Sequence, residues 1–188
     1  MVWQLINFQQ HRARQHQPQV HKPPSTADHN PPAPAHPVPA MLKNIPPLLT
    51  PDALHALASM GHGDDVAIVD ANFPAARVAQ QSGARLVQLA GTSAPQVLNA
   101  VLQLLPLDDF VPDAAWTMQV VGNATAIPAP VAEFASALAQ AGERPAVSLE
   151  RFDFYERAQS AYLILQTGEQ RKYGNIVLRK GVIASDDE

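Results

Sequence analysis

Residues 60–74 read Met-Gly-His-Gly-Asp-Asp-Val-Ala-Ile-Val-Asp-Ala-Asn-Phe-Pro, and this stretch decides the fold. Its centre, Val66–Val69, is a short apolar run rich in β-branched residues, which is typical of a strand buried on both faces of a parallel sheet. His62 precedes the strand between two glycines, and Asp70 closes it. Ligands of open α/β sheets bind beyond the carboxyl ends of the strands. An imidazole and a carboxylate brought to one cleft would form an acid–base pair, so the stretch suggests half of an active site.

The composition of the 188-residue chain limits the classes of function. Its net charge of −4 does not favour a general nucleic-acid binder, which needs a basic patch. The absence of cysteine excludes disulfides, thiolate metal sites and cysteine nucleophiles. No apolar run approaches the length of a membrane span. We therefore expect a cytoplasmic protein with neither nucleic-acid nor membrane partners.

Residues 1–40 differ from the rest of the chain. They hold eight of the 18 prolines and five of the seven histidines, with few large apolar residues. Prolines remove backbone donors and oppose helix, and so few apolar residues cannot form a core. The histidines are irregularly spaced, which favours a solvated tail over a metal-binding tract. The composition predicts a disordered extension over 1–40 and one folded domain over 41–188.

Helical and strand patterns alternate through the folded part. Helical patterns are expected at 51–60, 93–105, 131–141 and 152–160, with a short segment at 75–81; strands are expected at 66–69, 85–89, 116–121, 147–149, 162–166 and 176–178. This alternation predicts an α/β fold with a mainly parallel sheet and helices on both faces. No glycine-rich phosphate motif follows any strand, so nothing supports a nucleotide-binding function.

Each candidate functional residue has a purely structural alternative. His62 could be a helix-terminal histidine that interacts with the helix dipole, and Asp70 could cap the following turn. Arg151, beside the aromatic residues of the 152–157 segment, could begin a salt-bridged helix rather than hold hydroxyls. The Tyr173-Gly174-Asn175 sequence could be a turn into the last strand or could present a phenol and an amide to a polyhydroxylated ligand.

A metal site has little support in this pattern. Asp64 and Asp65 lie close to His62 and Asp70 in sequence, but such a cluster is not specific. Zinc sites show firmer histidine or cysteine spacing. We expect no metal and no other cofactor.

Seven motifs occur in one order along the chain. They are Met41-Leu42-Lys43, Met60-Gly61-His62-Gly63-Asp64, Asp70-Ala71-Asn72-Phe73-Pro74, Arg151-Phe152, Phe154-Tyr155-Glu156-Arg157-Ala158-Gln159, Thr167-Gly168-Glu169 and Lys172-Tyr173-Gly174-Asn175. Together they resemble the family of L-fucose mutarotases and D-ribose pyranases, over about residues 41–183. The aromatic segment and the arginine before it resemble the fucose-type members.

The resemblance implies a Rossmann-like three-layer fold and ring-like homo-oligomers with sites near subunit contacts. It implies an acid–base histidine at His62 and sugar binding by Asp70, Arg151 and the turn formed by Tyr173, Gly174 and Asn175. Tyr155 and Glu156 are secondary candidates. One departure is Asn72, where many fucose-type relatives have histidine. Asparagine cannot donate a proton as an acid, so the essential acid is not expected there.

The implied reaction suits these residue types. A pyranose changes anomer when a base removes the anomeric hydroxyl proton, an acid protonates the ring oxygen, and the aldehyde end rotates before closure. No carbon–hydrogen bond breaks, so neither metal nor nicotinamide is required. An ordinary histidine, with a pKa of about 6.5, can perform either proton transfer near neutral pH. We expect an isomerase acting on L-fucose; the alternatives are a D-ribose pyranase or broader aldose mutarotase, and a non-catalytic monosaccharide-binding module.

Overall fold

The structure is a computed structural model and describes residues 42–183. The extension expected over 1–40 lies outside the described residues, so its disorder stays a prediction. Among the described residues, no helix has both the length and the apolar character needed to cross a membrane.

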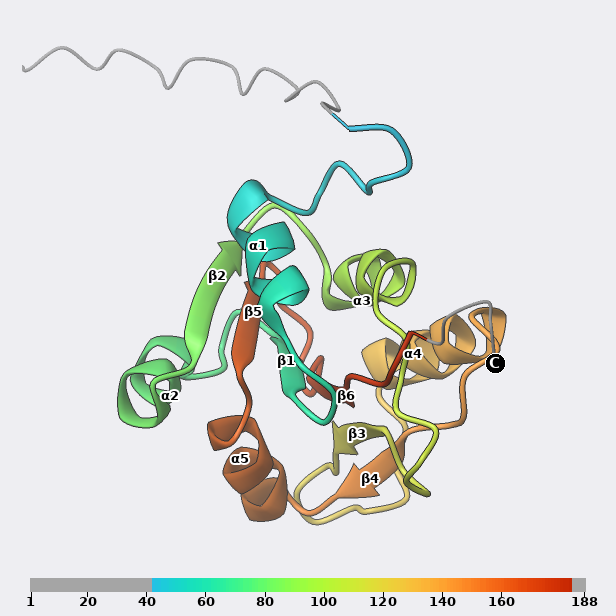
Figure 1. The fold of residues 1–188 in the computed structure, drawn as a ribbon. Helices are drawn as coiled ribbons and strands as arrows, with labels where there is room; N and C mark the ends of the chain where they lie inside the picture. The colour runs from blue at the N-terminus through green and yellow to red at the C-terminus, as the bar shows by residue number, and fades with distance from the viewer. Residues whose placement is uncertain (1–41, 184–188) are drawn as a thin grey trace, which may run out of the picture. The chain divides into compact units, whose positions relative to one another are not determined.

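The described part of the chain contains one six-stranded sheet, whose strands lie in the order β2-β5-β1-β6-β3-β4 (Figure 1). Strand β6 runs antiparallel to both of its neighbours, and all other adjacent strands are parallel. The short loop 168–175 cannot hold the crossover helix that a parallel return would need, so β6 is reversed. The mainly parallel sheet is confirmed. Its strands are β1 Asp65–Val69, β2 Arg85–Leu89, β3 Ala115–Met118, β4 Val147–Leu149, β5 Leu163–Thr167 and β6 Ile176–Arg179.

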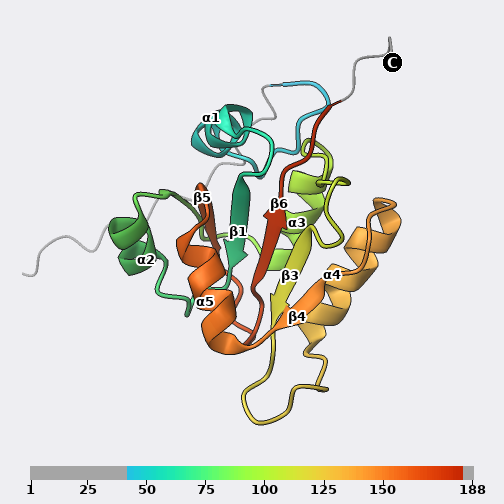
Figure 2. The same ribbon diagram turned by 60° about the horizontal axis from the view of Figure 1, so that its bottom comes forward.

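Helices cover both faces of this sheet, which confirms the three-layer arrangement (Figure 2). Helices α1, α3 and α4 pack on one face, and α2 and α5 pack on the other. Their bounds are α1 Pro51–Ser59, α2 Ala75–Ser82, α3 Ala94–Leu102, α4 Ala129–Gln140 and α5 Arg151–Gln159.

Strand β1 contributes side chains to the hydrophobic cores on both faces of the sheet. Val66 and Ile68 face the core beneath α1 and α3, whereas Ala67 and Val69 face the core beneath α2 and α5. The four residues Val66–Val69 are all buried, as their apolar character predicts. Burying a valine or isoleucine side chain contributes roughly 1.5–3 kcal/mol, so this strand is a major source of stability.

Local capping explains where two helices begin. The Thr50 hydroxyl accepts a hydrogen bond from the Ala53 N–H at 3.3 Å, and a proline occupies the first position of α1. At α3, Ser93 and Gln96 form a reciprocal capping box. The predicted ends of α3 and of the third strand extend too far. Helix α3 ends at Leu102, because the next N–H groups converge on the Val101 carbonyl in a tighter turn.

Strand β3 ends at Met118 rather than at residue 121. The Gln119 N–H still bonds the Leu149 carbonyl at 2.8 Å. Val120 and Asn123 then pair across a turn, which ends the strand. This turn carries Val121 to one end of the sheet, where it borders the candidate site described next.

Candidate active site

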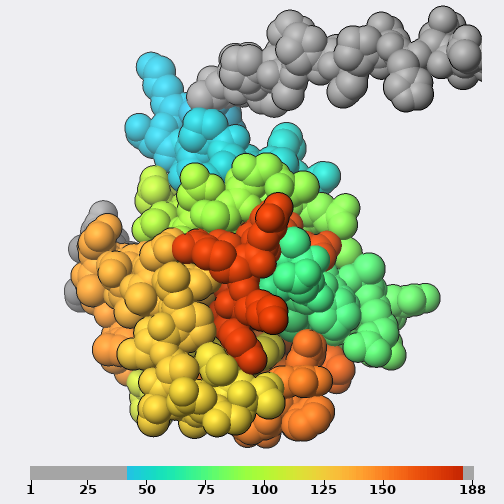
Figure 3. Space-filling view, turned by 180° about the vertical axis from the view of Figure 1, so that it is seen from behind, coloured from blue at the N-terminus to red at the C-terminus, as the bar shows by residue number. Residues whose placement is uncertain are grey.

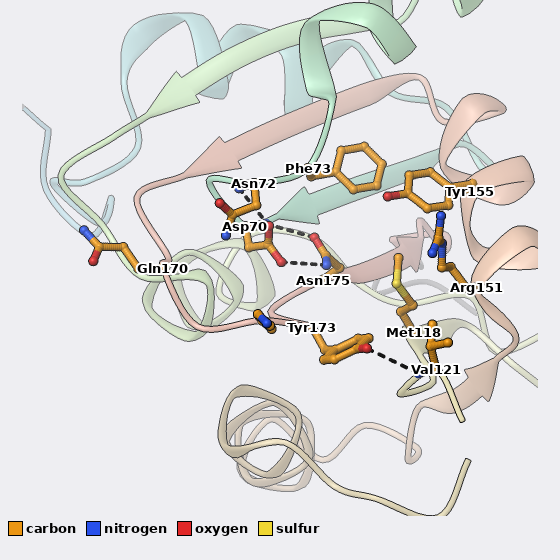
Figure 4. Close-up of a pocket in the computed structure, with 11 residues that line it drawn as sticks. Asp70, Asn72, Phe73, Met118, Val121, Arg151, Tyr155, Gln170, Tyr173 and Asn175 are labelled. Carbon is orange, nitrogen blue, oxygen red and sulfur yellow. Dashed lines mark hydrogen bonds between the residues drawn. The ribbon is translucent and has the colours of Figure 1, made fainter. Parts of the chain in front are cut away.

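A cavity of about 450 Å³ lies at the carboxyl ends of β1 and β3 (Figure 4). Four segments meet there: the loop after β1, the turn after β3, the start of α5 and the loop between β5 and β6. From behind, the orange-red β5–β6 loop lies at the surface between the yellow segment after β3 and the green segment after β1 (Figure 3). The lining residues are Asp70, Asn72, Phe73, Met118, Val121, Arg151, Tyr155, Gln170, Lys172, Tyr173 and Asn175.

Asp70 and Asn175 form the buried floor of the cavity. The Asn175 side-chain amide donates to Asp70 Oδ2 at 2.8 Å, and the Asp70 N–H donates to Asn175 Oδ1 at 2.9 Å. The Asn72 N–H donates to Asp70 Oδ1 at 2.9 Å. Burial raises the pKa of Asp70, although these hydrogen bonds favour its ionised form and oppose the shift. The carboxylate is thereby fixed as an acceptor at the end of β1.

Tyr173 forms the opposite wall. Its backbone has a φ of 64°, which is uncommon for a residue with a bulky side chain. Its hydroxyl oxygen accepts a hydrogen bond from the Val121 N–H at 3.2 Å, which joins the β5–β6 loop to the turn after β3. The hydroxyl proton is not used in that contact, so the phenol can still donate to a ligand oxygen.

Gly174 allows the loop to pass close to Asp70. A Cβ atom at this position would lie 2.7 Å from the Glu169 Cγ atom and 3.5 Å from the Asp70 Cβ atom. The first distance is shorter than van der Waals contact allows, so only glycine fits without displacing its neighbours. Gly174 therefore contributes to the site by leaving room for the close approach of the loop, and not through a side-chain contact.

Arg171 anchors the same loop from outside the cavity. Its guanidinium donates to Glu169 at 2.9 Å from Nε and 2.8 Å from Nη2, and it also pairs with Glu133 on α4. Glu169 is buried, and the hydrogen bonds from Arg171 hold the pKa of its carboxyl below the ordinary value. The loop that carries Tyr173 and Asn175 is thus tied to the body of the domain.

Tyr155 and Arg151 from α5, with Phe73 from the loop after β1, form the remaining wall. The rings of Phe73 and Tyr155 stack with centroids 5.2 Å apart and an angle of 17° between their planes. The Arg151 guanidinium lies 5.8 Å from the centroid of the Tyr155 ring. Glu156 is exposed and does not line the cavity, so its secondary role stays a prediction.

A single chain does not bring His62 to this cavity. His62 lies before β1 and Asp70 lies after it, and a five-residue strand spans roughly 16 Å. His62 is 47% exposed at the opposite end of the sheet, with Nε2 3.2 Å from Asp108 Oδ1. The expectation that one chain places the imidazole and Asp70 in one cleft is therefore not met. The catalytic assignment of His62 stays a prediction.

The cavity does bring together five of the predicted residues: Asp70, Arg151, Tyr155, Tyr173 and Asn175. They supply a carboxylate, a guanidinium, a phenol and an amide beside an aromatic face, which suits a small molecule with several hydroxyls. Sequence reasoning missed the roles of Met118, Val121 and Gln170. Met118 ends β3 and Val121 lies in the turn after it, but both fall inside the predicted strand 116–121. The rule that ligands lie at carboxyl ends could have found them only if the end of that strand had been predicted correctly.

Comparisons with known proteins identify similar chains and structures. The fucose mutarotase of Homo sapiens is 46% identical over 147 residues, covering 76% of this chain and 95% of the relative. That of Bos taurus is 42% identical over 150 residues, covering 78% and 97%. The crystal structure of the fucose mutarotase from Streptococcus pneumoniae in complex with L-fucose matches with a TM-score of 0.70 and 38% identity. That match covers 76% of this chain and all of the other.

The model of the RbsD / FucU transport protein family matches residues 43–183, nearly all of the described part of the chain. The resemblance found in the ordered motifs is confirmed. The chain belongs to the RbsD / FucU transport protein family.

Proposed function

We propose that this protein is an isomerase that interconverts the α and β anomers of L-fucose. The observation that carries the proposal is the convergence of Asp70, Arg151, Tyr173 and Asn175 on one cavity of sugar size, beside the stacked aromatic pair. Relatives of 46% and 42% identity carry the name fucose mutarotase, and the related Streptococcus pneumoniae structure is a complex with L-fucose. Both support fucose as the substrate.

Each side chain in the cavity has a role that its chemistry suits. The Asp70 carboxylate accepts hydrogen bonds from sugar hydroxyls, and the Asn175 amide holds that carboxylate in place. Arg151 presents fixed N–H donors to sugar oxygens. Tyr173 can donate its free hydroxyl proton while its oxygen remains bound to the Val121 N–H. The Tyr155 ring covers the apolar face of the sugar.

His62 is the proposed acid–base residue, and it acts from a second copy of the chain. Its side chain is half exposed at the sheet end opposite the cavity, so it is accessible to another molecule but not to its own cavity. The resemblance to ring-like oligomers with sites near subunit contacts supports this arrangement. We propose a homo-oligomer in the cytoplasm in which each complete site combines the His62 of one protomer with the cavity of its partner.

Saturation-difference NMR between the anomeric protons tests the proposed activity. Irradiating the α-anomer proton of L-fucose should reduce the β-anomer signal in the presence of protein, at rates well above those in buffer alone. Parallel runs with D-galactose and D-ribose measure specificity. Faster exchange with ribose than with fucose would favour a D-ribose pyranase. Saturable fucose binding without faster exchange would instead indicate a binding module.

A further inference from the structure

Two cationic side chains line the cavity and have no acidic partner in the described part of the chain. Arg151 approaches from the start of α5 (Figure 4), and Lys172 belongs to the loop between β5 and β6. Both side chains are exposed, and no carboxylate among residues 42–183 forms an ion pair with either. The backbone of Lys172 is fixed at the cavity, because its neighbours Arg171 and Tyr173 are each held by hydrogen bonds.

Such unpaired cations are uncommon elsewhere in the described part of the chain. The other lysines and arginines there mostly have a hydrogen bond or an ion pair with another residue, namely Arg85, Arg144, Arg157, Arg171, Arg179 and Lys180. Among the same residues, only Lys43 and Arg77 resemble the cavity pair in having neither, and neither of them lines the cavity. Two unpaired cations at one cavity concentrate positive charge where a ligand binds.

The acidic groups near the cavity do not balance this charge. Asp70 is the one carboxylate among the described residues that line the cavity. It is bound by hydrogen bonds from the Asn175 amide and the Asn72 N–H rather than by an ion pair. The Glu150 carboxylate lies in a neighbouring cavity and caps α5 by accepting the Phe152 N–H at 2.6 Å. Even when Asp70 is ionised, two cations in the cavity therefore face a single anion.

A neutral sugar such as L-fucose leaves this excess positive charge unmatched, whereas a sugar that carries an anion would match it. The reaction limits where that anion can lie. The anomeric hydroxyl must stay free for the ring to open, and the ring hydroxyls match the hydrogen-bonding groups of the cavity. The remaining carbon is C6, which is a methyl group in L-fucose and a carboxylate in a hexuronate. Carboxylates form strong, charge-assisted hydrogen bonds with lysine and arginine.

We propose that the cavity also accepts hexuronates as substrates, with the Lys172 ammonium pairing with the C6 carboxylate. This inference rests on the proposed function, because it extends the range of sugars at the same site. Arg151 keeps its role toward sugar oxygens and adds to the positive potential. During ring opening, the anomeric hydroxyl loses its proton to the acid–base group, the ring C–O bond breaks with its electron pair going to the ring oxygen, and that oxygen gains a proton. Closure reverses these steps, and the carboxylate keeps all of its bonds throughout.

Three sugars of one configuration differ only at C6 and therefore isolate the effect of its charge. L-Fucose has a methyl group there, L-galactose a hydroxymethyl group and L-galacturonate a carboxylate. In calorimetric titrations of the full-length protein at about 20 mM salt, L-galacturonate should bind about fivefold more tightly than L-galactose, the upper range for an exposed ion pair. This affinity ratio should approach one at about 1 M salt, where the charges are screened. Saturation-difference NMR should show that the protein accelerates exchange between the L-galacturonate anomers.

Lys172→Met tests the assigned contact, because it removes the charge and keeps an unbranched side chain. In this variant, the ratio of L-galacturonate to L-galactose affinity at low salt should fall to within about twofold of one. Lys43→Met is the matched control, because Lys43 is exposed and does not line the cavity, so the ratio should keep its wild-type value. Comparing ratios removes any general effect of a substitution on sugar binding. Melting temperature and light scattering are measured in parallel.

A wild-type ratio of one or less at low salt would overturn the inference. A fivefold ratio retained in folded Lys172→Met would overturn it as well, by assigning the anion to another group. A loss of oligomer mass in that variant with an unchanged ratio would show that Lys172 pairs with an acid of a partner subunit instead. L-Galacturonate that binds without faster exchange, to a protein that accelerates L-fucose exchange, would also contradict it. Titration needs no turnover, so a wild-type protein that does not accelerate L-fucose exchange would refute the proposed function separately.

Discussion

Asp70 and Asn175 are joined by two hydrogen bonds, although 105 positions separate them in sequence. In one bond the Asp70 N–H donates to the amide oxygen, and in the other the amide nitrogen donates to the carboxylate. Both residues are buried, with only 4% of the surface of each exposed. The pair links the end of β1 to the start of β6, so the floor of the cavity is also part of the domain's core.

Asn175→Ala should therefore affect both stability and binding. The substitution leaves the Asp70 N–H without its acceptor and removes one donor from a buried carboxylate. We expect a loss of roughly 1–3 kcal/mol in the free energy of unfolding. Fucose affinity should fall as well, because the carboxylate is no longer held. Urea unfolding and fucose titration measure the two effects. Asn99→Ala, an exposed asparagine on α3, is the control; if it costs as much stability, the pair is not responsible.

The titration of Asp70 predicts opposite pH trends for stability and binding. Its pKa is raised above the ordinary 3.8 in the folded protein, so the folded state binds the proton more readily than the unfolded chain. The stability contribution of this group therefore falls as pH rises from 3.8 through the raised pKa. Fucose affinity should instead rise over the same window, because the ionised carboxylate is the better acceptor.

Unfolding and fucose-binding curves measured from pH 3.8 upwards test this pair of trends. Asp70→Asn cannot titrate, so both dependences should flatten in that variant. Two unchanged slopes in Asp70→Asn would assign the titration to another group.

Arg171→Met should weaken the anchor of the β5–β6 loop. It leaves the buried Glu169 carboxylate without its cation, and we expect a loss of about 1–3 kcal/mol. The contact favours the ionised form of Glu169, so its contribution is present above the ordinary pKa of 4.5 and disappears as pH falls through the lowered folded value. That acid-dependent loss should be absent from the variant. Thermal unfolding at several pH values measures it. Arg77→Met, on the exposed part of α2, should change little.

Gly174→Ala tests whether the close approach of the loop to Asp70 matters. The added methyl would meet the Glu169 Cγ atom at 2.7 Å, so the loop must shift. Because Tyr173 and Asn175 flank this position, we expect fucose affinity to fall at least tenfold, a cost of about 1.4 kcal/mol. Calorimetric titration measures the affinity. Gly91→Ala is the control, since a Cβ there meets nothing within 4 Å. Equal affinities for the Gly174 variant and the wild type would show that the space is not needed.

Much of the fold could be predicted from sequence because its signals are local. The apolar run at Val66–Val69, the proline after Thr50 and the Ser93 cap each act within a few residues, and each element formed near its expected position. The short loop between the last two predicted strands already excludes a parallel return of β6, but the place of β6 between β1 and β3 is a long-range pairing that no local pattern encodes. The end of β3 was also missed, because the pairing of Val120 with Asn123 decides it.

The candidate site shows the same limit. Asp70, Arg151 and the turn at residues 173–175 meet in one cavity, as the family resemblance implied. His62 precedes the predicted strand and Asp70 follows it, so the sequence already places them at opposite ends of one strand. The sequence does not show which other residues contact each of them. Asp108 could not be found from spacing, because its contact with His62 joins the turn after α3 to the turn before β1.

The most direct test of the account measures fucose anomer exchange in mixed oligomers of two impaired variants, at a fucose concentration too low to saturate the weaker binder. His62→Asn keeps the cavity but lacks the proposed acid–base group, so its exchange rate should fall roughly 10²-fold or more. Arg151→Ala keeps His62 but weakens sugar binding. If a complete site combines two protomers, refolding the variants together in equal amounts should restore roughly a quarter of the sites. Saturation-difference NMR should then show exchange at roughly a quarter of the wild-type rate. Exchange no faster than in either variant alone would contradict a site shared between protomers, and wild-type exchange in His62→Asn alone would contradict the role of His62.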